Sequence, residues 1–438
     1  MRMKNFLLLG LLFICFSTTA QRILTLEQAI ATALQNNYEI RLARNDSAVA
    51  ALNYSFANAA FLPRFNGTGG LTWNNNDQKQ KFADGTDRQK KGVRSSNISA
   101  GLAMNWTLFD GLKMFATRDK LEEFIKLGEL GIKNQVVTTI ATVINNYYDI
   151  VRQKQQLKAI EEQMAVYEDR VKLAEAKFEI GTGIKPDVLQ GKVDLNAQRS
   201  ARLQQLTLIA KLKEQLNLAM NVALNTDYDV SDDIPINFNL SLGDIQTSIE
   251  ATNPSLLIAQ QNITIAELTL KETRAERWPI ISFNSAYNFS RTNNNAVVNP
   301  FSPLFNQNKG LNYGVTASIP ILNNFNNRRL IRQAQLDIQY QELIYENERA
   351  RLNLGVINAY KDYEFQKKAL ELEESNISLA RENVQIAMER YRLGVSTFLE
   401  LREAQRSLED AFNRLIAARF NTKLAETELL RLRGDLVR

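Results

Sequence analysis

The sequence contains an internal repeat, and this duplication limits the folds open to the chain more than any other feature of the sequence. Segment 143–147, with the sequence VINNY, returns at 356–360 as VINAY, 213 residues later. The same offset carries Gly181 onto Gly394. Each half reads in the order helix, strand, polar loop, strand, very long helix, glycine-containing turn and long helix. The sequence therefore predicts two copies of one α+β unit.

The boundaries of the two copies follow from this pattern. We predict a signal peptide at 1–20, a first structural repeat at 21–221, an acidic linker at 222–241 and a second structural repeat at 242–438. Within the repeats, strands are expected at about 64–75, 95–109, 280–291 and 310–322, and the tips of two helical hairpins near 181–183 and 394–396.

The first twenty residues have the three parts of a secretory signal peptide. Arg2 and Lys4 precede an apolar stretch at 6–16, and small residues follow up to Ala20. The apolar run is shorter than the roughly 20 residues that a membrane-spanning helix needs, which disfavours the alternative of a membrane anchor. Lipidation at Cys15 is disfavoured because the bulky Ile14 precedes it. We therefore expect export of the mature protein.

Composition argues against several classes of function. The net charge of +5 is small and the basic residues are scattered, which does not suit a nucleic-acid partner. The only cysteine lies in the predicted signal peptide, and the chain has no histidine. Disulfides, Ser-His-Asp triads and histidine-ligated metals are therefore excluded from the mature chain. An enzyme using carboxylates alone would need a convergent polar site, and none is visible. We predict no catalytic residue, cofactor or metal.

Four segments alternate between apolar and polar residues, the pattern of strands with one apolar face. In the clearest segment the apolar members are Ile98, Ala100, Leu102, Met104, Trp106 and Leu108. Each segment has about 10 residues, the length of a tilted membrane strand. A strand of a soluble sandwich would look similar, but here two strand pairs occur with no further strands to cover their faces. Polar loops at 74–94 and 292–309 join the pairs. These features favour a membrane β-barrel.

Pro63 and Pro279 stand directly before the first strand of each pair. Proline fixes its own φ and disfavours the helical conformation in the residue before it. We therefore interpret both prolines as swivels between helix and strand.

The predicted helices are too long for an ordinary globular core. Residues 112–180 and 325–393 contain no proline, and each would reach about 100 Å at 1.5 Å per residue. In the last helix, Leu401, Leu408 and Leu415 recur at intervals of seven with alanines between them. Such a narrow seam lets helices approach closely, as in a coiled coil. A coiled-coil rod would explain these helices but not the strand pairs.

This layout resembles the TolC-like outer-membrane efflux protein family over residues 21–438. Segment 391–397, YRLGVST, looks like the family's Tyr/Phe-Arg-x-Gly-x-x-Thr hairpin tip, and the acidic Glu400 follows it. The first-half tip, FEIGTG at 178–183, has Glu179 where arginine is usual in the family but keeps Asp187 six residues after Gly181.

The resemblance implies an internally duplicated α+β membrane protein. It contributes four strands to a trimeric 12-stranded β-barrel and adds a long coiled-coil α-helical barrel in the periplasm of a Gram-negative bacterium. The implied function is the outer-membrane exit channel of a tripartite efflux or type I secretion system. The implied partners are two further copies of the chain, outer-membrane lipid, a periplasmic adaptor and an inner-membrane pump of the RND, ABC or MFS type. The alternative is a periplasmic coiled-coil adaptor without a pore.

The number of strands per chain also predicts an oligomer, independently of the resemblance. Four strands cannot close a barrel, and an open edge in lipid leaves unsatisfied backbone groups. A dimer would give eight strands and a filled interior, whereas a trimer would give twelve strands and room for a pore. Transport would be passive, because the chain has no glycine-rich phosphate loop.

The resemblance also assigns roles to residues at the hairpin tips. Acidic residues after the second tip ring the closed aperture in the family, and they correspond to Glu400 and Glu403 here; Asp187 is a further candidate. For each a simpler role exists: Thr397 and Glu400 form a possible capping box, and Asp187 suits the first turn of a helix. The candidate adaptor-docking residues are Gly181, Thr182, Gly183, Arg392, Leu393, Gly394, Val395 and Ser396. The glycines would also serve turns that need a positive φ.

Overall fold

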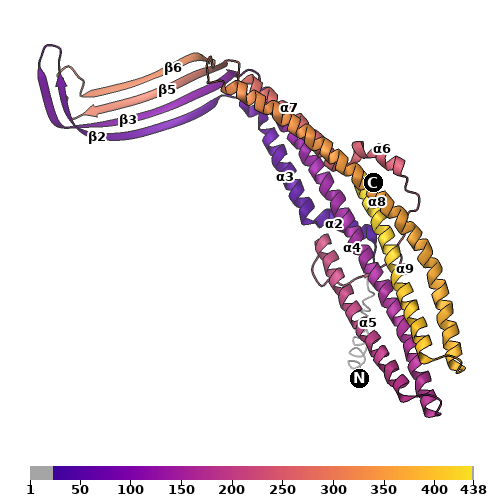
Figure 1. Ribbon diagram of the computed structural model, residues 1–438. Helices are drawn as coiled ribbons and strands as arrows, with labels where there is room; N and C mark the ends of the chain where they lie inside the picture. Colours follow the sequence, from indigo (N-terminus) through magenta and orange to yellow (C-terminus); the bar gives the residue numbers. More distant parts are fainter. Residues whose placement is uncertain (1–22, 437–438) are drawn as a thin grey trace, which may run out of the picture. The chain divides into compact units, whose positions relative to one another are not determined.

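The computed structural model describes residues 23–436, so the predicted signal peptide lies outside the described residues. The described chain divides into two compact units that do not coincide with the two predicted repeats. The helical unit comprises the described parts of Met1–Asp46, Glu129–Ile258 and Tyr345–Arg438. The sheet unit comprises Ser47–Gly128 and Ala259–Ile344. Each unit thus takes segments from both halves of the sequence (Figure 1).

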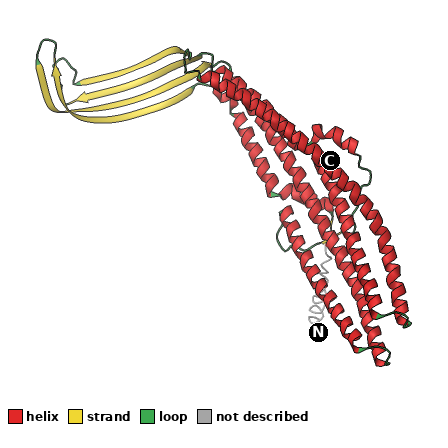
Figure 2. Ribbon diagram, viewed as in Figure 1, coloured by secondary structure: helices red, strands yellow, loops and turns green. Residues whose placement is uncertain are grey.

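Helices make up most of the described chain (Figure 2). They are α2 (Leu26–Asn36), α3 (Tyr38–Ser55), the short 3-10 helix η1 (Ala57–Phe61), α4 (Lys113–Glu179), α5 (Lys185–Met220), α6 (Leu242–Thr252), α7 (Pro254–Ala275), α8 (Asn326–Arg392) and α9 (Phe398–Arg433). The long helices match between the halves, since α4 and α8 each have 67 residues and α5 and α9 each have 36. No helix in the described part of the chain is both long and apolar enough to cross a membrane.

The core of the helical unit includes the segment that was expected to be a linker. In 222–241, Tyr228, Val230 and Ile234 are buried in the same apolar cluster as Tyr147 of α4. The short strands β1 (Ile23–Leu24) and β4 (Asp229–Val230) pair in parallel. The segment is therefore packed structure, although its aspartates suggested a solvated connection. The apolar residues of the segment are buried in the core, which its many aspartates did not suggest.

The Tyr147 hydroxyl fixes both strands of this small pair. It donates to the carbonyl of Leu24 at 2.9 Å and accepts from the backbone N–H of Ser231 at 3.2 Å. In the second half, the Tyr363 hydroxyl on α8 donates to the carbonyl of Asn237 at 2.6 Å. Buried hydroxyls thus satisfy backbone groups on both sides of the connection between the repeats.

Four antiparallel strands form the sheet of the sheet unit, in the order β2-β3-β5-β6 (Figure 1). Their bounds are β2 (Arg64–Lys81), β3 (Asp87–Phe109), β5 (Ile280–Asn294) and β6 (Phe305–Ser318). β3 and β5, from different halves of the sequence, pair along most of their length. Within the described residues, β2 pairs only with β3, and β6 only with β5. The sheet therefore has two open edges.

The strands differ in length from those expected. β2 and β3 continue through most of the predicted loop at 74–94, with pairs such as Gln78–Lys90 and a bulge near Asn76. These strand segments have polar residues on both faces, so a search for apolar–polar alternation does not detect them. β6 begins earlier than expected and ends at Ser318 rather than at 322. Pro320 has no N–H to donate, so pairing stops before it.

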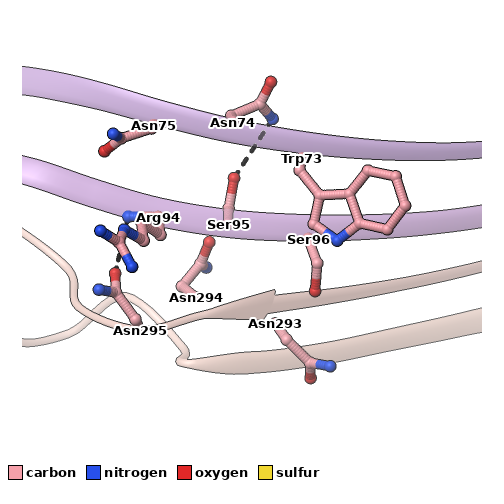
Figure 3. Close-up of a pocket in the computed structure, with 9 residues that line it drawn as sticks. All are labelled: Trp73, Asn74, Asn75, Arg94, Ser95, Ser96, Asn293, Asn294 and Asn295. Carbon is pink, nitrogen blue, oxygen red and sulfur yellow. Dashed lines mark hydrogen bonds between the residues drawn. The ribbon is translucent and has the colours of Figure 1, made fainter.

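The register separates the sheet into an apolar and a polar face. On the apolar face, Leu102, Tyr287 and Leu311 lie side by side on β3, β5 and β6. On the polar face, the amide of Asn105 donates to Asn284 Oδ1 at 2.5 Å, and that of Asn284 donates to Thr316 Oγ1 at 2.8 Å. Figure 3 shows the same alternation nearer the distal strand ends, where Trp73 and Asn74 point to opposite sides of β2.

Candidate functional site

Both helical hairpins of the helical unit turn at a glycine with positive φ. Gly181 has φ +79° and Gly394 has φ +78°, a region that side chains with a Cβ rarely adopt. The backbone N–H groups of Thr182 and Gly183 donate to the carbonyl of Lys177 and so close the end of α4. In the second tip, the N–H of Val395 donates to the carbonyl of Arg390 at 3.0 Å. These glycines therefore have a structural role whatever the tips bind.

Most of the predicted docking residues are exposed. Thr182, Arg392, Leu393 and Val395 are exposed along with both turn glycines, whereas Gly183 and Ser396 are half-buried. Apolar side chains stand out at these tips, since Leu393 is 75% exposed and Val395 is 63% exposed. Exposed large apolar side chains at a tip are costly in water and suit a protein contact.

The predicted aperture residues lie at the starts of α5 and α9. Glu400 and Glu403 are exposed on α9, and Asp187 is half-buried in the first turn of α5. Thr397 is the N-cap of α9: its hydroxyl oxygen accepts from the N–H of Glu400 and donates to Glu400 Oε1, both at 3.2 Å. The Glu400 carboxylate therefore contacts the capping hydroxyl, and only half of the reciprocal capping box is formed.

Lys177 links the two tips directly. Its Nζ donates to the backbone carbonyl of Tyr391 at 2.5 Å and lies 4.1 Å from the centroid of the Tyr391 ring. Burial raises the pKa of the Tyr391 hydroxyl, and the nearby negative charge of Asp187 raises it further. The structure thus brings Asp187, Lys177 and Tyr391 together, although they come from three different helices.

A buried arginine joins the two hairpins just inside the tips. Arg170 of α4 is fully buried, and its Nη2 lies 2.6 Å from Asp194 Oδ2 on α5. Its Nη1 donates to Gln405 Oε1 on α9 at 2.7 Å. Arg402, also on α9, approaches the same oxygen of Asp194 at 3.2 Å. These contacts hold together three helices from both halves of the sequence, with the Asp194 carboxylate shared by Arg170 and Arg402.

Aromatic rings complete the surroundings of this guanidinium. Arg170 Cζ lies 4.6 Å from the centroid of Tyr167 and 4.8 Å from that of Phe398, distances that favour cation–π attraction. Burial lowers the pKa of Arg170, and the charge of Asp194 opposes that change. We call Arg170, Asp194, Gln405 and Arg402 the hairpin clamp.

Sequence reasoning missed the hairpin clamp, although a signal was present. Arg170 lies between Tyr167 and Val171 on the buried face of α4, and Gln405 follows Ala404 on the buried face of α9. A charged or polar residue on an apolar stripe needs a partner when it is buried. The sequence alone does not identify that partner, because Arg170 and Gln405 are 235 residues apart.

The predicted swivels lie in the sheet unit. Pro63 separates η1 from β2, and Pro279 separates α7 from β5. Next to the first swivel, the indole N–H of Trp106 on β3 donates to the carbonyl of Phe61 at 2.8 Å. This bond satisfies the indole and ties the end of η1 to the sheet.

Comparison with known proteins agrees with this architecture. The profile of the family described as outer membrane efflux protein matches residues 29–222 and 247–435. The toluene efflux pump outer membrane protein TtgF of Pseudomonas putida is 24% identical over 93% of this chain and 83% of its own. Outer membrane protein TolC of Vibrio cholerae is 21% identical over 90% and 86%. The solved outer-membrane channel OprN superimposes with a TM-score of 0.77 at 18% identity, covering 94% of this chain and 90% of that one.

These matches confirm the predicted fold class, outer-membrane location and role as an efflux channel, and they do not favour the alternative of an adaptor without a pore. The relatives are transport proteins and not enzymes. The family profile covers nearly all of both repeats, and between its two matched segments it leaves out 223–246. The chain therefore belongs to the outer membrane efflux protein family.

Proposed function

We propose that the protein is a non-enzymatic, passive channel that assembles as a homotrimer, with three four-stranded sheets closing one twelve-stranded barrel. The observation that carries this proposal is the open sheet with one apolar face: β2 and β6 each have an edge without a partner within the described residues. In lipid each unsatisfied backbone group costs several kcal/mol, so both edges must pair with other strands. Edge-to-edge pairing of β2 with β6 of another copy satisfies both.

A second apolar surface supports self-association of the helical unit. Along α8, large apolar residues recur every seven positions and remain more than half exposed: Phe365, Leu372, Leu379 and Ile386. A stripe with this spacing forms the seam of a coiled coil. In the trimer it would pack against a helix of the neighbouring copy.

The hairpin tips would meet a periplasmic adaptor, which couples the channel to an inner-membrane pump of the RND, ABC or MFS type. Exposure of Leu393 and Val395 supports an adaptor contact there. Glu400 and Glu403, with Asp187, would line the aperture, where three copies would place several carboxylates close together. Such a ring favours cations and repels anions.

Two measurements on the detergent-extracted protein test this function. Detergent-corrected mass analysis should give a trimer, and the same preparation should conduct ions in a planar bilayer. A stable monomer or dimer would contradict the assembly, and a trimer without conductance would contradict the channel.

A further inference from the structure

Within segments 64–73, 95–109, 280–294 and 305–318 of the sheet, two cations lie on the apolar face. The register places Lys309 of β6 opposite Phe289 of β5, and Arg291 of β5 opposite Gln307 of β6. Lys309 and Arg291 are therefore diagonal neighbours on adjacent strands, within roughly 7–8 Å by the geometry of such pairs. They lie on the same face as Tyr287 and Leu311, which are paired with each other nearer the Ile280–Ser318 end of the two strands.

In the described part of the chain, neither cation of this pair forms a salt bridge with a carboxylate. Segments 64–73, 95–109, 280–294 and 305–318 contain no aspartate or glutamate. Both cationic side chains are exposed, and Arg291 Cζ lies 5.3 Å from the centroid of the Phe305 ring. A cation on a lipid-facing surface is costly unless it reaches an interface or an anion.

The distance of the two cations from the Ile281–Ala317 end of the sheet places them near the outer membrane–water interface. Lys309 is eight residues from Ala317, and Arg291 is ten residues from Ile281, which lies at the helix-proximal end of the apolar face. At about 3.3 Å per residue and a tilt of about 40°, these separations correspond to heights of about 20 and 25 Å. The apolar band of an outer-membrane barrel is about 25 Å tall. The two cations therefore lie near its distal edge.

We propose that Arg291 and Lys309 bind the phosphate groups of a phosphorylated glycolipid in the outer leaflet, with Phe289 and Phe305 contacting its first acyl carbons. The proposal rests on the proposed function, because it takes the apolar face to be in contact with lipid. A guanidinium and an ammonium side by side complement a headgroup that carries more than one phosphate. Each copy of the chain would hold one such lipid.

Arg64 offers a matched control. Segments 64–73, 95–109, 280–294 and 305–318 contain one further cation, Arg64. It is the first residue of β2 and lies opposite Asn105 on the polar face of the sheet, away from the proposed site. Arg64→Gln removes the same charge without touching the proposed site. Comparison of R291Q/K309Q with R64Q thus separates loss of a specific contact from a general loss of positive charge.

The test is retention of lipid by the intact, full-length protein. Wild type, R291Q/K309Q and R64Q are reconstituted with a diphosphorylated glucosamine lipid or its dephosphorylated form, and the lipid that remains bound after mild detergent extraction is counted by native mass spectrometry. Wild type and R64Q should retain the phosphorylated form at least about tenfold better than R291Q/K309Q, since each cation near an anionic surface contributes about one kcal/mol. The dephosphorylated form should show no such difference.

Several outcomes would overturn the proposal. Equal retention of both lipid forms by wild type would mean that the two cations are solvated by water and do not bind lipid phosphate. Displacement of the lipid from wild type by millimolar inorganic phosphate would indicate a general anion site instead of a lipid site. Conductance of the same preparations is measured in parallel. A wild-type trimer that conducts but shows no phosphate preference refutes the lipid site alone, whereas loss of assembly or conductance in wild type refutes the proposed function.

Discussion

Arg170 on α4 and Gln405 on α9 are joined by a 2.7 Å hydrogen bond that spans 235 residues of sequence. This bond connects the hairpin of the first repeat to that of the second, close to both tips. Asp194 completes the connection by binding Arg170 and Arg402 together. The tips of this channel are therefore held to each other by a polar contact in a largely apolar helix seam, and any motion that parts the two hairpins must break it.

The first prediction concerns this clamp. Arg170→Ala leaves the half-buried carboxylate of Asp194 with the exposed Arg402 as its ion-pair partner and a hydrogen bond from Gln190. It should therefore destabilise the protein by about 3–5 kcal/mol, the usual cost of removing one partner of a buried ion pair. Thermal unfolding of the detergent-extracted protein measures the loss. The matched control is Arg199→Ala, which removes an exposed pair with Glu168 at 3.6 Å between the same two helices. That change should cost less than about 1 kcal/mol. Equal effects of the two substitutions would show that the clamp has no special role.

The second prediction concerns the link between the tips. Lys177→Met removes the hydrogen bond to the Tyr391 carbonyl and the cation–π contact with its ring. We expect the channel to spend more time in its more conductive state, because a contact between the hairpins is lost. Tyr391→Phe retains the carbonyl and a ring, so its single-channel traces should resemble wild type. If Tyr391→Phe changes the open fraction as strongly as Lys177→Met does, the hydroxyl near Asp187 makes the contact that matters.

The third prediction concerns ion selectivity. Replacing Glu400 and Glu403 together by Gln should reduce the cation-to-anion permeability ratio by about twofold or more and weaken block by multivalent cations, since like charges in a confined mouth favour cations. Reversal potentials in a salt gradient give the ratio. Thr397→Ala is the control for capping: it should lower the melting temperature through loss of the N-cap, at a cost of about 1 kcal/mol, and leave selectivity unchanged. Unchanged selectivity in the glutamine variant would assign Glu400 to the helix cap alone.

The fourth prediction concerns the long hairpin of β2 and β3. Its turn at 82–86 contains Gly85 with φ +86° and an Asp84 carboxylate that accepts from Thr86. An epitope inserted at this turn should be accessible to antibody on intact cells, because the turn joins the strand ends distal to the helices. An insertion in the 181–183 tip is the comparison and should be accessible only after the outer membrane is breached. The reverse pattern of labelling would invert the topology.

The sequence by itself determined the repeating parts of this protein. Local periodicity identified strands with one apolar face, the long proline-free helices and the glycine turns, because each of these depends on neighbours only a few residues apart. Leu401 and Leu408, for example, lie on the predicted heptad stripe and are buried. The duplicated layout and the motif at 391–397 together indicated the family, which the family profile then confirmed.

Only the tertiary structure decided which distant residues meet. The pairing of β3 with β5 joined the two strand pairs into one sheet, and the register of β5 against β6 placed Arg291 beside Lys309. Helix packing buried Arg170 against Asp194 and Gln405. The packed connection around Tyr228 and the paired continuation of β2 and β3 were likewise missed. Local patterns report the face on which a residue lies but not its partner, since a partner depends on register and packing between segments that are far apart in the chain.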